Sequence, residues 1–515
     1  MLQINILVNW KLGKLNKLTL KLKHHQKMKR YLPIALLFCL SFSHSHAQTT
    51  VKQDPALKQM VDEVSSQNIE AIVRKLVSFK TRNTLSDTTS ATEGIGAARN
   101  WIKSEMEKYA AASGGRMKVE FDAFTQPAGG RIDKPTVLKN VLAILKGTDP
   151  TDNRIYVVSG HYDSRVTDVM NANAIEPGAV DDASGTAVSM EICRVMAKRS
   201  FPATIIFMSV PGEEQGLNGS AHIAKRAKDE KWNVDAMLNN DIVGNTHGMD
   251  NDLKDNTHVR VFSEGLPSID LPSREDGKTL FGINQRTGAS IVEPLTKADS
   301  IAARREIAVI NGLISNGGEN DSPSRQLARY IKETAERYVD QLDVKLVYRR
   351  DRFLRGGDQT SFQLNGFTAV RFTEMNEDFT HQHQDLRTEK GIVYGDLPEF
   401  ADYNYIQKVA RMNLSVLANL ASAPASPQNV VVTTAELTNN TTLKWAAPTA
   451  GKKPVGYYVL MRETISPYWE KKFYVTGTEA TLDYSKDNYL FAVQSVDADG
   501  HESLPIYPKP ARGGR

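Results

Sequence analysis

The stretch that decides the fold is Ile155-Tyr156-Val157-Val158-Ser159-Gly160-His161-Tyr162-Asp163-Ser164, in which an apolar run ends in polar side chains. We predict a buried strand over 155–159, a helix over 185–199 and a second, continuous apolar strand over 203–210. Unbroken apolar strands that alternate with helices are typical of a mostly parallel sheet covered on both faces. The sequence therefore predicts an α/β fold in which a mostly parallel, mixed sheet is sandwiched by helices.

The same alternation extends in both directions along the chain. Apolar spacing predicts a helix over 54–80 and another over 94–111. The remaining expected elements are strands over 117–124, 140–145 and 345–348, and helices after Gly219, over 325–341 and over 403–420. Residues from about 265 to 318 break the pattern, because they are polar and carry turn signals such as Asp276-Gly277. We predict an insertion there that shapes the specificity pocket.

Polar and acidic side chains follow the central strands. His161 and Asp163 end the first strand, Asp181-Asp182 opens the next helix, Glu213-Glu214 follows the strand over 203–210, and Asn240-Asp241 comes further along. Sites in open α/β sheets assemble at the carboxyl ends of the strands. We therefore expect these side chains to meet at one edge of the sheet.

This set of donors, one histidine with several carboxylates and no cysteine, suits Zn²⁺ or a similar divalent ion. So many acids can be buried together only with cations. Two metal ions about 3.5–4 Å apart, bridged by one carboxylate, would meet that need. Each motif alone is common on solvated surfaces, but chance does not explain all of them in order at strand ends. In the pair Glu213-Glu214, one carboxylate can bind metal while the other handles the proton of a water.

The series His161-x-Asp163, Gly178-Ala179-x-Asp181-Asp182-Ala183-Ser184-Gly185, Glu213-Glu214-x-Gly216-x-x-Gly219-Ser220 and Asn240-Asp241 resembles the di-zinc exopeptidase family. That family includes bacterial leucyl aminopeptidases, glutamate carboxypeptidase II and, more distantly, glutaminyl cyclases. The resemblance extends over residues 69–420 and implies two zinc ions per chain.

The resemblance also implies a role for each side chain. Asp181 would bridge the two zinc ions, with His161 and Asp241 completing one site. Glu214 and a histidine late in the chain would complete the other. Glu213 would be the general base, and Asp163 would hold the His161 ring.

The late histidine has two candidates. Relatives place it four residues before an aspartate, which His381 satisfies with Asp385. His381 is therefore the predicted ligand, and His383 is the alternative.

A second departure from the family pattern lies close by. The segment Gly356-Gly357-Asp358-Gln359 resembles a Ser-Asp-His segment of the family. The tyrosine that polarises the scissile carbonyl in some aminopeptidases is missing, and Leu354 stands in its place. Arg352 or Arg355 is a candidate for that role, although an arginine at such a position is more often an ordinary exposed one.

The expected function is that of a secreted zinc aminopeptidase acting on peptides. A carboxypeptidase or a glutaminyl cyclase of the same fold is the alternative, and Asp182 favours a peptidase because cyclases usually replace the second aspartate. A non-catalytic binding protein is the alternative of another class, and the presence of every expected ligand and of the base argues against it. No nucleic-acid motif is present.

The net charge of +4, from 64 Lys and Arg against 60 Asp and Glu, originates at the amino terminus. Residues 1–47 hold eight basic residues and no acid, and they end in an apolar run from 31 to 42 and the small-x-small site Ser45-His46-Ala47. This pattern predicts a signal peptide, with 1–27 a possible mis-assigned extension, and export to the periplasm or beyond. Without those eight, 56 basic residues face 60 acids, so the charge of the mature chain is −4. No membrane span is expected after cleavage.

The 515 residues exceed what one hydrophobic core holds. We predict a peptidase domain over 48–420, a Pro- and Ala-rich linker over 421–427 and an all-β sandwich over 428–510. Leu443-Lys444-Trp445 with Tyr489-x-Phe491-x-Val493 resembles fibronectin type III modules. The expected role of this domain is either contact with a polymer, a partner or a cell surface, or stabilisation of the enzyme, and the sequence does not choose between them.

Overall fold

The computed structural model describes residues 51, 53–266, 279–283, 290–294, 310–435 and 437–511. The chain divides into two units, Met1–Ala47 and Gln48–Arg515, and the first, which carries the predicted signal peptide, lies outside the described residues. Most of the predicted insertion also lies outside them, apart from residues 265–266 and 310–318 and the antiparallel pair β7 (Thr279–Ile283) and β8 (Ser290–Pro294). No helix among the described residues is long and apolar enough to cross a membrane.

One eight-stranded mixed sheet forms the centre of the second unit. In spatial order its strands are β1 (Met117–Gln126), β2 (Thr136–Leu145), β4 (Thr204–Val210), β3 (Arg154–His161), β5 (Asn233–Asn240), β10 (Ala369–Glu374), β6 (His258–Ser263) and β9 (Asp343–Val347). The four central strands β4, β3, β5 and β10 are parallel, as are β6 and β9. The pairs β1–β2, β2–β4 and β6–β10 are antiparallel. The mixed, mostly parallel sheet is therefore confirmed.

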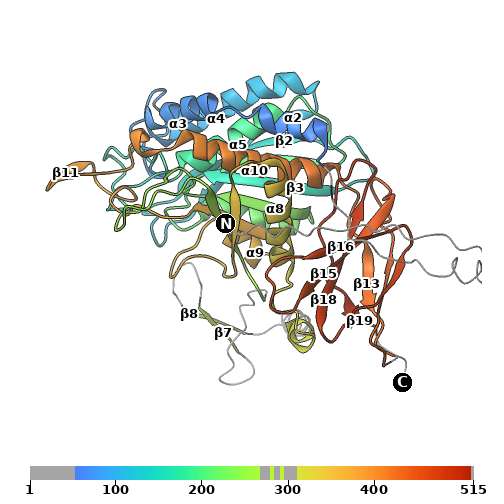
Figure 1. Cartoon of the computed structure of the whole chain (residues 1–515). Helices are drawn as coiled ribbons and strands as arrows, with labels where there is room; N and C mark the ends of the chain where they lie inside the picture. The colour runs from blue at the N-terminus through green and yellow to red at the C-terminus, as the bar shows by residue number, and fades with distance from the viewer. Residues whose placement is uncertain are drawn as a thin grey trace, which may run out of the picture. The chain divides into compact units, whose positions relative to one another are not determined.

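Helices cover both faces of this sheet. Successive side chains of a strand point to opposite faces, so each strand contributes to two separate hydrophobic cores. On β3, Tyr156 and Val158 belong to the larger core, and Val157 belongs to the smaller one. The larger core is covered by α2 (Pro55–Asp62), α3 (Ser66–Val77), α4 (Gly94–Ala110), α5 (Ala183–Met196), α8 (Pro323–Tyr338) and α10 (Tyr403–Ser422). Figure 1 shows the blue helices α2, α3 and α4 on the same side of the sheet as α5 and α10. The smaller core is covered by α6 (Asn218–Asp229) and α9 (Gln359–Leu364).

The single helix predicted over 54–80 is wrong, because two helices occupy that range. The backbone of Ser65 is extended, and its side chain accepts a hydrogen bond from the Asn68 N–H as the N-cap of α3. The apolar positions continue across this break, which is why periodicity alone does not reveal it. The sequence pattern also led to no predicted strand where the structure has β5, β6 and β10.

The carboxy-terminal residues form two further sheets. One contains β17 (Glu479–Leu482), β14 (Thr441–Ala446), β13 (Gln428–Val432) and β19 (Lys509–Pro510), and the other contains β16 (Lys471–Val475), β15 (Gly456–Glu463) and β18 (Tyr489–Val496). Leu443 and Trp445 from the first sheet share one apolar cluster with Val459 and Phe491 from the second. The resemblance of this region to fibronectin type III modules stays a prediction.

The segment predicted as a linker is packed against the peptidase region. Helix α10 runs on to Ser422, so the range 421–427 begins inside a helix. The guanidinium of Arg154, in β3, donates to the carbonyl oxygens of Ala423 and Pro424 at 2.7 and 3.2 Å. These contacts tie the start of the carboxy-terminal region to the central sheet.

Candidate metal and active site

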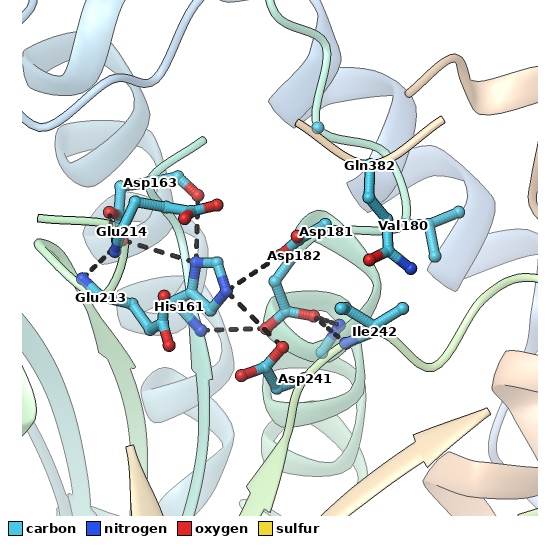
Figure 2. Close-up of polar contacts among 12 residues, drawn as sticks. His161, Asp163, Val180, Asp181, Asp182, Glu213, Glu214, Asp241, Ile242 and Gln382 are labelled. Atoms are coloured by element: carbon cyan, nitrogen blue, oxygen red, sulfur yellow. Dashed lines mark hydrogen bonds and ion pairs between the residues drawn. The ribbon is translucent and has the colours of Figure 1, made fainter. Parts of the chain in front are cut away.

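Three neighbouring parallel strands deliver the candidate side chains to one edge of the sheet. His161 is the last residue of β3, Glu213 and Glu214 follow β4, and Asp241 follows β5. Asp181 directly precedes Asp182, the N-cap of α5. The prediction that the strand ends bring these motifs together is confirmed, and Figure 2 shows the His161 ring between Asp163 on one side and Asp181 and Asp241 on the other.

Two groups of possible metal ligands share the Asp181 carboxylate. In one, His161 Nε2 lies 3.2 Å from Asp181 Oδ1 and 3.8 Å from Asp241 Oδ1. In the other, His383 Nε2 lies 3.0 Å from Asp181 Oδ2 and 2.9 Å from Glu214 Oε1. The two oxygens of Asp181 thus face different histidines, as a bridging carboxylate requires.

The structure does not place His381, the predicted late ligand, beside Asp181 and Glu214, where His383 lies instead. The His381 ring stacks on Phe400 with the centroids 3.7 Å apart, and its Nε2 lies 3.6 Å from Asp378 Oδ2. The Gln382 N–H donates to the Asp378 carbonyl, which closes a turn, and His383 follows with φ of +56°. The turn carries His383 into the site, so the alternative ligand is the one that the structure supports.

Asp163 is buried behind His161 and holds the surrounding loops. Its Oδ1 lies 3.5 Å from His161 Nδ1, and its two oxygens accept hydrogen bonds from the backbone N–H groups of Glu213 and Glu214 at 3.3 and 3.2 Å. The Thr84 hydroxyl donates to Asp163 Oδ2 at 3.0 Å. Asp163 therefore fixes the ring and the Glu213-Glu214 loop together, which makes it a positioning residue.

Asp182 has a similar role that the sequence did not assign to it. Its carboxylate accepts hydrogen bonds from the backbone N–H groups of His161, Gly185 and Ile242 at 3.0, 2.9 and 3.2 Å. It therefore joins the end of β3, the start of α5 and the loop after Asp241. An aspartate just before Ala-Ser-Gly is the N-cap signal that reveals part of this role.

Burial and mutual charge shift the acidity of these groups in opposite directions. Burial raises the pKa of Glu213 well above its usual value, and the Asp241 and Glu214 charges add to that effect. For Asp181, burial also acts to raise the pKa, but the imidazoles of His161 and His383 outweigh it, and the pKa falls well below the usual value. Burial acts to lower the pKa of His161, but the surrounding carboxylates outweigh it, and the pKa rises well above its usual value.

The donors present fit a bound metal. Asp241 Oδ2 and Glu214 Oε1 are buried without a hydrogen-bond partner among the described residues, although Glu214 Oε1 lies 2.9 Å from a ring nitrogen of His383. Buried carboxylate oxygens without a donor are costly, and a cation between them would remove the cost. Imidazole nitrogen and carboxylate oxygen are ligands that zinc takes.

A cavity of about 780 Å³ opens onto this cluster. Glu213, Glu214, Asp181, Asp241 and His383 line it together with Leu354. Six arginines line it as well: Arg131, Arg165, Arg350, Arg352, Arg355 and Arg371. Of these, the sequence singled out only Arg352 and Arg355. No local pattern marks the other four, although Arg165 lies only two residues after Asp163.

Comparison with known proteins places this site in context. Residues 140–258 match peptidase family M28. A probable zinc metalloprotease of Leptosphaeria maculans is 45% identical over 455 residues, which cover 88% of this chain and 97% of the relative. A probable zinc metalloprotease of Pyrenophora teres f. teres is 45% identical over 460 residues, covering 89% of this chain and 88% of the relative. Among solved structures, the LapA aminopeptidase of Legionella pneumophila has 17% identity and a TM-score of 0.47, covering 75% of this chain and 79% of that chain.

Proposed function

The chain belongs to peptidase family M28 and is a zinc metallopeptidase, and from that premise we propose that it is an aminopeptidase with two zinc ions per chain. The observation that carries the two-zinc proposal is the sharing of Asp181 between two ligand groups. His161, Asp181 and Asp241 would hold one ion, and Asp181, Glu214 and His383 would hold the other. When bound, zinc acts as a Lewis acid on the scissile carbonyl and on the attacking water.

Glu213 is the group that moves the proton. Its backbone N–H is fixed by Asp163, its side chain lines the cavity, and no ion pair joins its carboxylate to another described residue. A carboxylate placed in this way takes a proton from the attacking water and then delivers it to the nitrogen of the leaving amine. The adjacent Glu214 faces His383 instead, with its Oε1 2.9 Å from His383 Nε2. The two neighbouring glutamates therefore have different roles: Glu213 transfers the proton and Glu214 binds metal.

Acids in the cavity support the aminopeptidase choice, because a free α-amine is cationic and needs a negative partner. Asp241 and Glu213 line the cavity and are the acids that such an amine could approach. The arginines favour a second candidate, a carboxypeptidase acting at the same centre, because they match a free α-carboxylate.

The test is a panel of aminoacyl chromogenic amides and N-blocked peptides, assayed with and without a chelator. Cleavage of the free-amine substrates, abolished by the chelator and restored by zinc, is expected. Cleavage of blocked peptides alone would refute the aminopeptidase proposal and support the carboxypeptidase.

The variant Glu213→Gln tests the proton step, since the amide keeps the shape but cannot take a proton. We expect it to retain the wild-type zinc content while kcat falls by about 10²–10⁴-fold. An active variant with normal zinc content would remove Glu213 from the role of base.

We also propose that the protein is exported. The basic, acid-free segment and apolar run before Gln48 support this proposal. Amino-terminal sequencing of the protein from its native host should find Gln48 as the first residue, and an intact leader on the mature protein would contradict export by cleavage.

A further inference from the structure

Close ion pairs hold three of the six arginines in the cavity. The pairs are Arg350 with Glu264 at 3.1 Å, Arg352 with Glu377 at 2.5 Å, and Arg371 with Asp241 at 2.7 Å. Each of these guanidinium groups is thus balanced by a carboxylate within hydrogen-bond distance. The ion pairs of these three arginines within the cavity wall account for their presence there without a bound ligand.

The other three, Arg131, Arg165 and Arg355, have no such partner among the described residues. No ion pair is found for Arg131, whose Nη1 instead donates to the backbone carbonyl of Glu214 at 2.8 Å. Arg165 Nε lies 3.8 Å from Glu214 Oε2, and this buried nitrogen makes no hydrogen bond to a described residue. Arg355 Nη1 lies 3.6 Å from Glu377 Oε2.

The nearby carboxylates do not balance these three guanidinium charges, because each carboxylate already forms a closer ion pair with another side chain. Glu377 is bound closely by Arg352 and by Arg260, at 2.5 and 2.7 Å. Glu214 Oε1 lies 2.9 Å from His383 Nε2, whereas Glu214 Oε2 lies 3.8 Å from Arg165 Nε. The cavity wall therefore presents three guanidinium groups that have no carboxylate of a described residue within hydrogen-bond distance.

The three arginines come from separate parts of the cavity wall. Arg131 lies in the loop between β1 and β2, and Arg165 lies in the loop that follows β3, and both lie close to Glu214. Arg355 belongs to the loop between β9 and α9 that also carries Leu354. Three loops that converge on one cavity with the same charge form a site for an anion.

From this arrangement we infer that the enzyme prefers peptides that carry a carboxylate next to the scissile bond, bound by Arg131, Arg165 and Arg355. The inference rests on the proposed peptidase activity and narrows its substrate class. Planar guanidinium groups match a carboxylate through paired, charge-assisted hydrogen bonds. The carboxylate has two possible sources: the acidic side chain of the amino-terminal residue, or the free carboxy terminus of a dipeptide.

Two isosteric comparisons separate these sources on the zinc-loaded protein. Glutamyl and glutaminyl p-nitroanilides differ only in the side-chain charge, and Leu-Leu and its carboxamide differ only in the terminal charge. We expect kcat/KM to favour the carboxylate by at least about tenfold in one pair, the factor that one charge-assisted hydrogen bond supplies. The preference should weaken as NaCl is added.

Single variants then assign the preference to the arginines. Arg131→Gln, Arg165→Gln and Arg355→Gln should each raise KM for the carboxylate substrate by a larger factor than KM for its uncharged partner, so that the ratio of the two kcat/KM values falls. Arg355→Lys should recover part of the loss. The matched control is Arg74→Gln, which replaces an exposed arginine of α3 outside the cavity. It should leave kcat/KM for both substrates unchanged.

A binding measurement keeps the inference testable even if no amine substrate is cleaved. Calorimetric titration with glutarate should show at least about tenfold weaker binding to the triple glutamine variant than to the wild type. Equal binding by both proteins, or equal kcat/KM within both substrate pairs, would overturn the inference. Failure to cleave any free-amine peptide, with glutarate binding lost in the triple variant, would instead refute only the aminopeptidase proposal.

Discussion

Two buried clusters of charge in this protein are built in opposite ways. At the strand ends, Asp181, Glu214 and Asp241 lie together, and two of their oxygens lack a hydrogen-bond donor. Where α8 meets the carboxy-terminal sheets, Asp321 is just as deeply buried, but its two oxygens each face an arginine, Arg329 at 2.9 Å and Arg462 at 2.7 Å. The first cluster is incomplete without a ligand, and the second is complete by itself.

A second carboxylate completes the same interface. Glu502 pairs with Arg337 at 2.9 Å and with Lys472 at 3.2 Å, and it accepts a hydrogen bond from the Asn419 side chain at 3.0 Å. Unsatisfied buried acids therefore mark the site of chemistry, and satisfied ones mark a structural joint. Breaking each cluster should affect different properties of the protein.

The largest expected effect comes from a pair of variants two residues apart. His383→Ala removes the proposed ligand that faces both Asp181 and Glu214, so we expect loss of one zinc ion per chain and a fall in kcat/KM of about 10²-fold or more. His381→Ala, the matched control, should keep both zinc ions and stay within about twofold of wild-type activity. Metal analysis and kinetics of the two proteins check this, and the reverse result would restore His381 as the ligand.

The structural joint should respond in stability instead. Asp321→Asn leaves Arg329 and Arg462 buried without their counter-charge, which costs about 3–5 kcal/mol. We expect a lower midpoint of denaturant unfolding but an unchanged zinc content in the folded protein. A variant that lost zinc without losing stability would contradict the separation of the two clusters.

A smaller effect is expected from pH. Burial acts to raise the pKa of Glu502, but Lys472 and Arg337 outweigh it and lower the pKa to about 2. Since this pKa lies below that of the unfolded chain, about 4.3, the stabilisation is present above that value and is lost as the pH falls toward 2. Glu502→Gln should therefore flatten the decline of the melting temperature between pH 4 and 2. An unchanged decline would show that other groups cause it.

The sequence was informative where local rules apply. The positions of His161, Asp181, Glu213, Glu214 and Asp241 follow from apolar strands and the residues that end them, and these five side chains do meet. Strand β5 was missed because its polar residues are satisfied by distant partners, such as Asp235, which accepts a hydrogen bond from the Tyr156 hydroxyl at 2.8 Å.

The remaining misses have a common physical cause. Loops have no periodicity, so the turn that selects His383 over His381 leaves no signal in the spacing. Arg131 reaches the cavity from a loop far from the ligand motifs in the sequence, and Arg165, although it follows Asp163 closely, belongs to no recognised motif. Contacts of this kind depend on the tertiary fold and cannot be derived from neighbouring residues.

The central claim is that one carboxylate joins two metal sites, and anomalous X-ray scattering at the zinc edge tests it most directly. Crystals of the zinc-loaded protein should show two peaks that share Asp181, one beside His161 and Asp241 and the other beside Glu214 and His383. A single peak, or a peak beside His381, would contradict the claim.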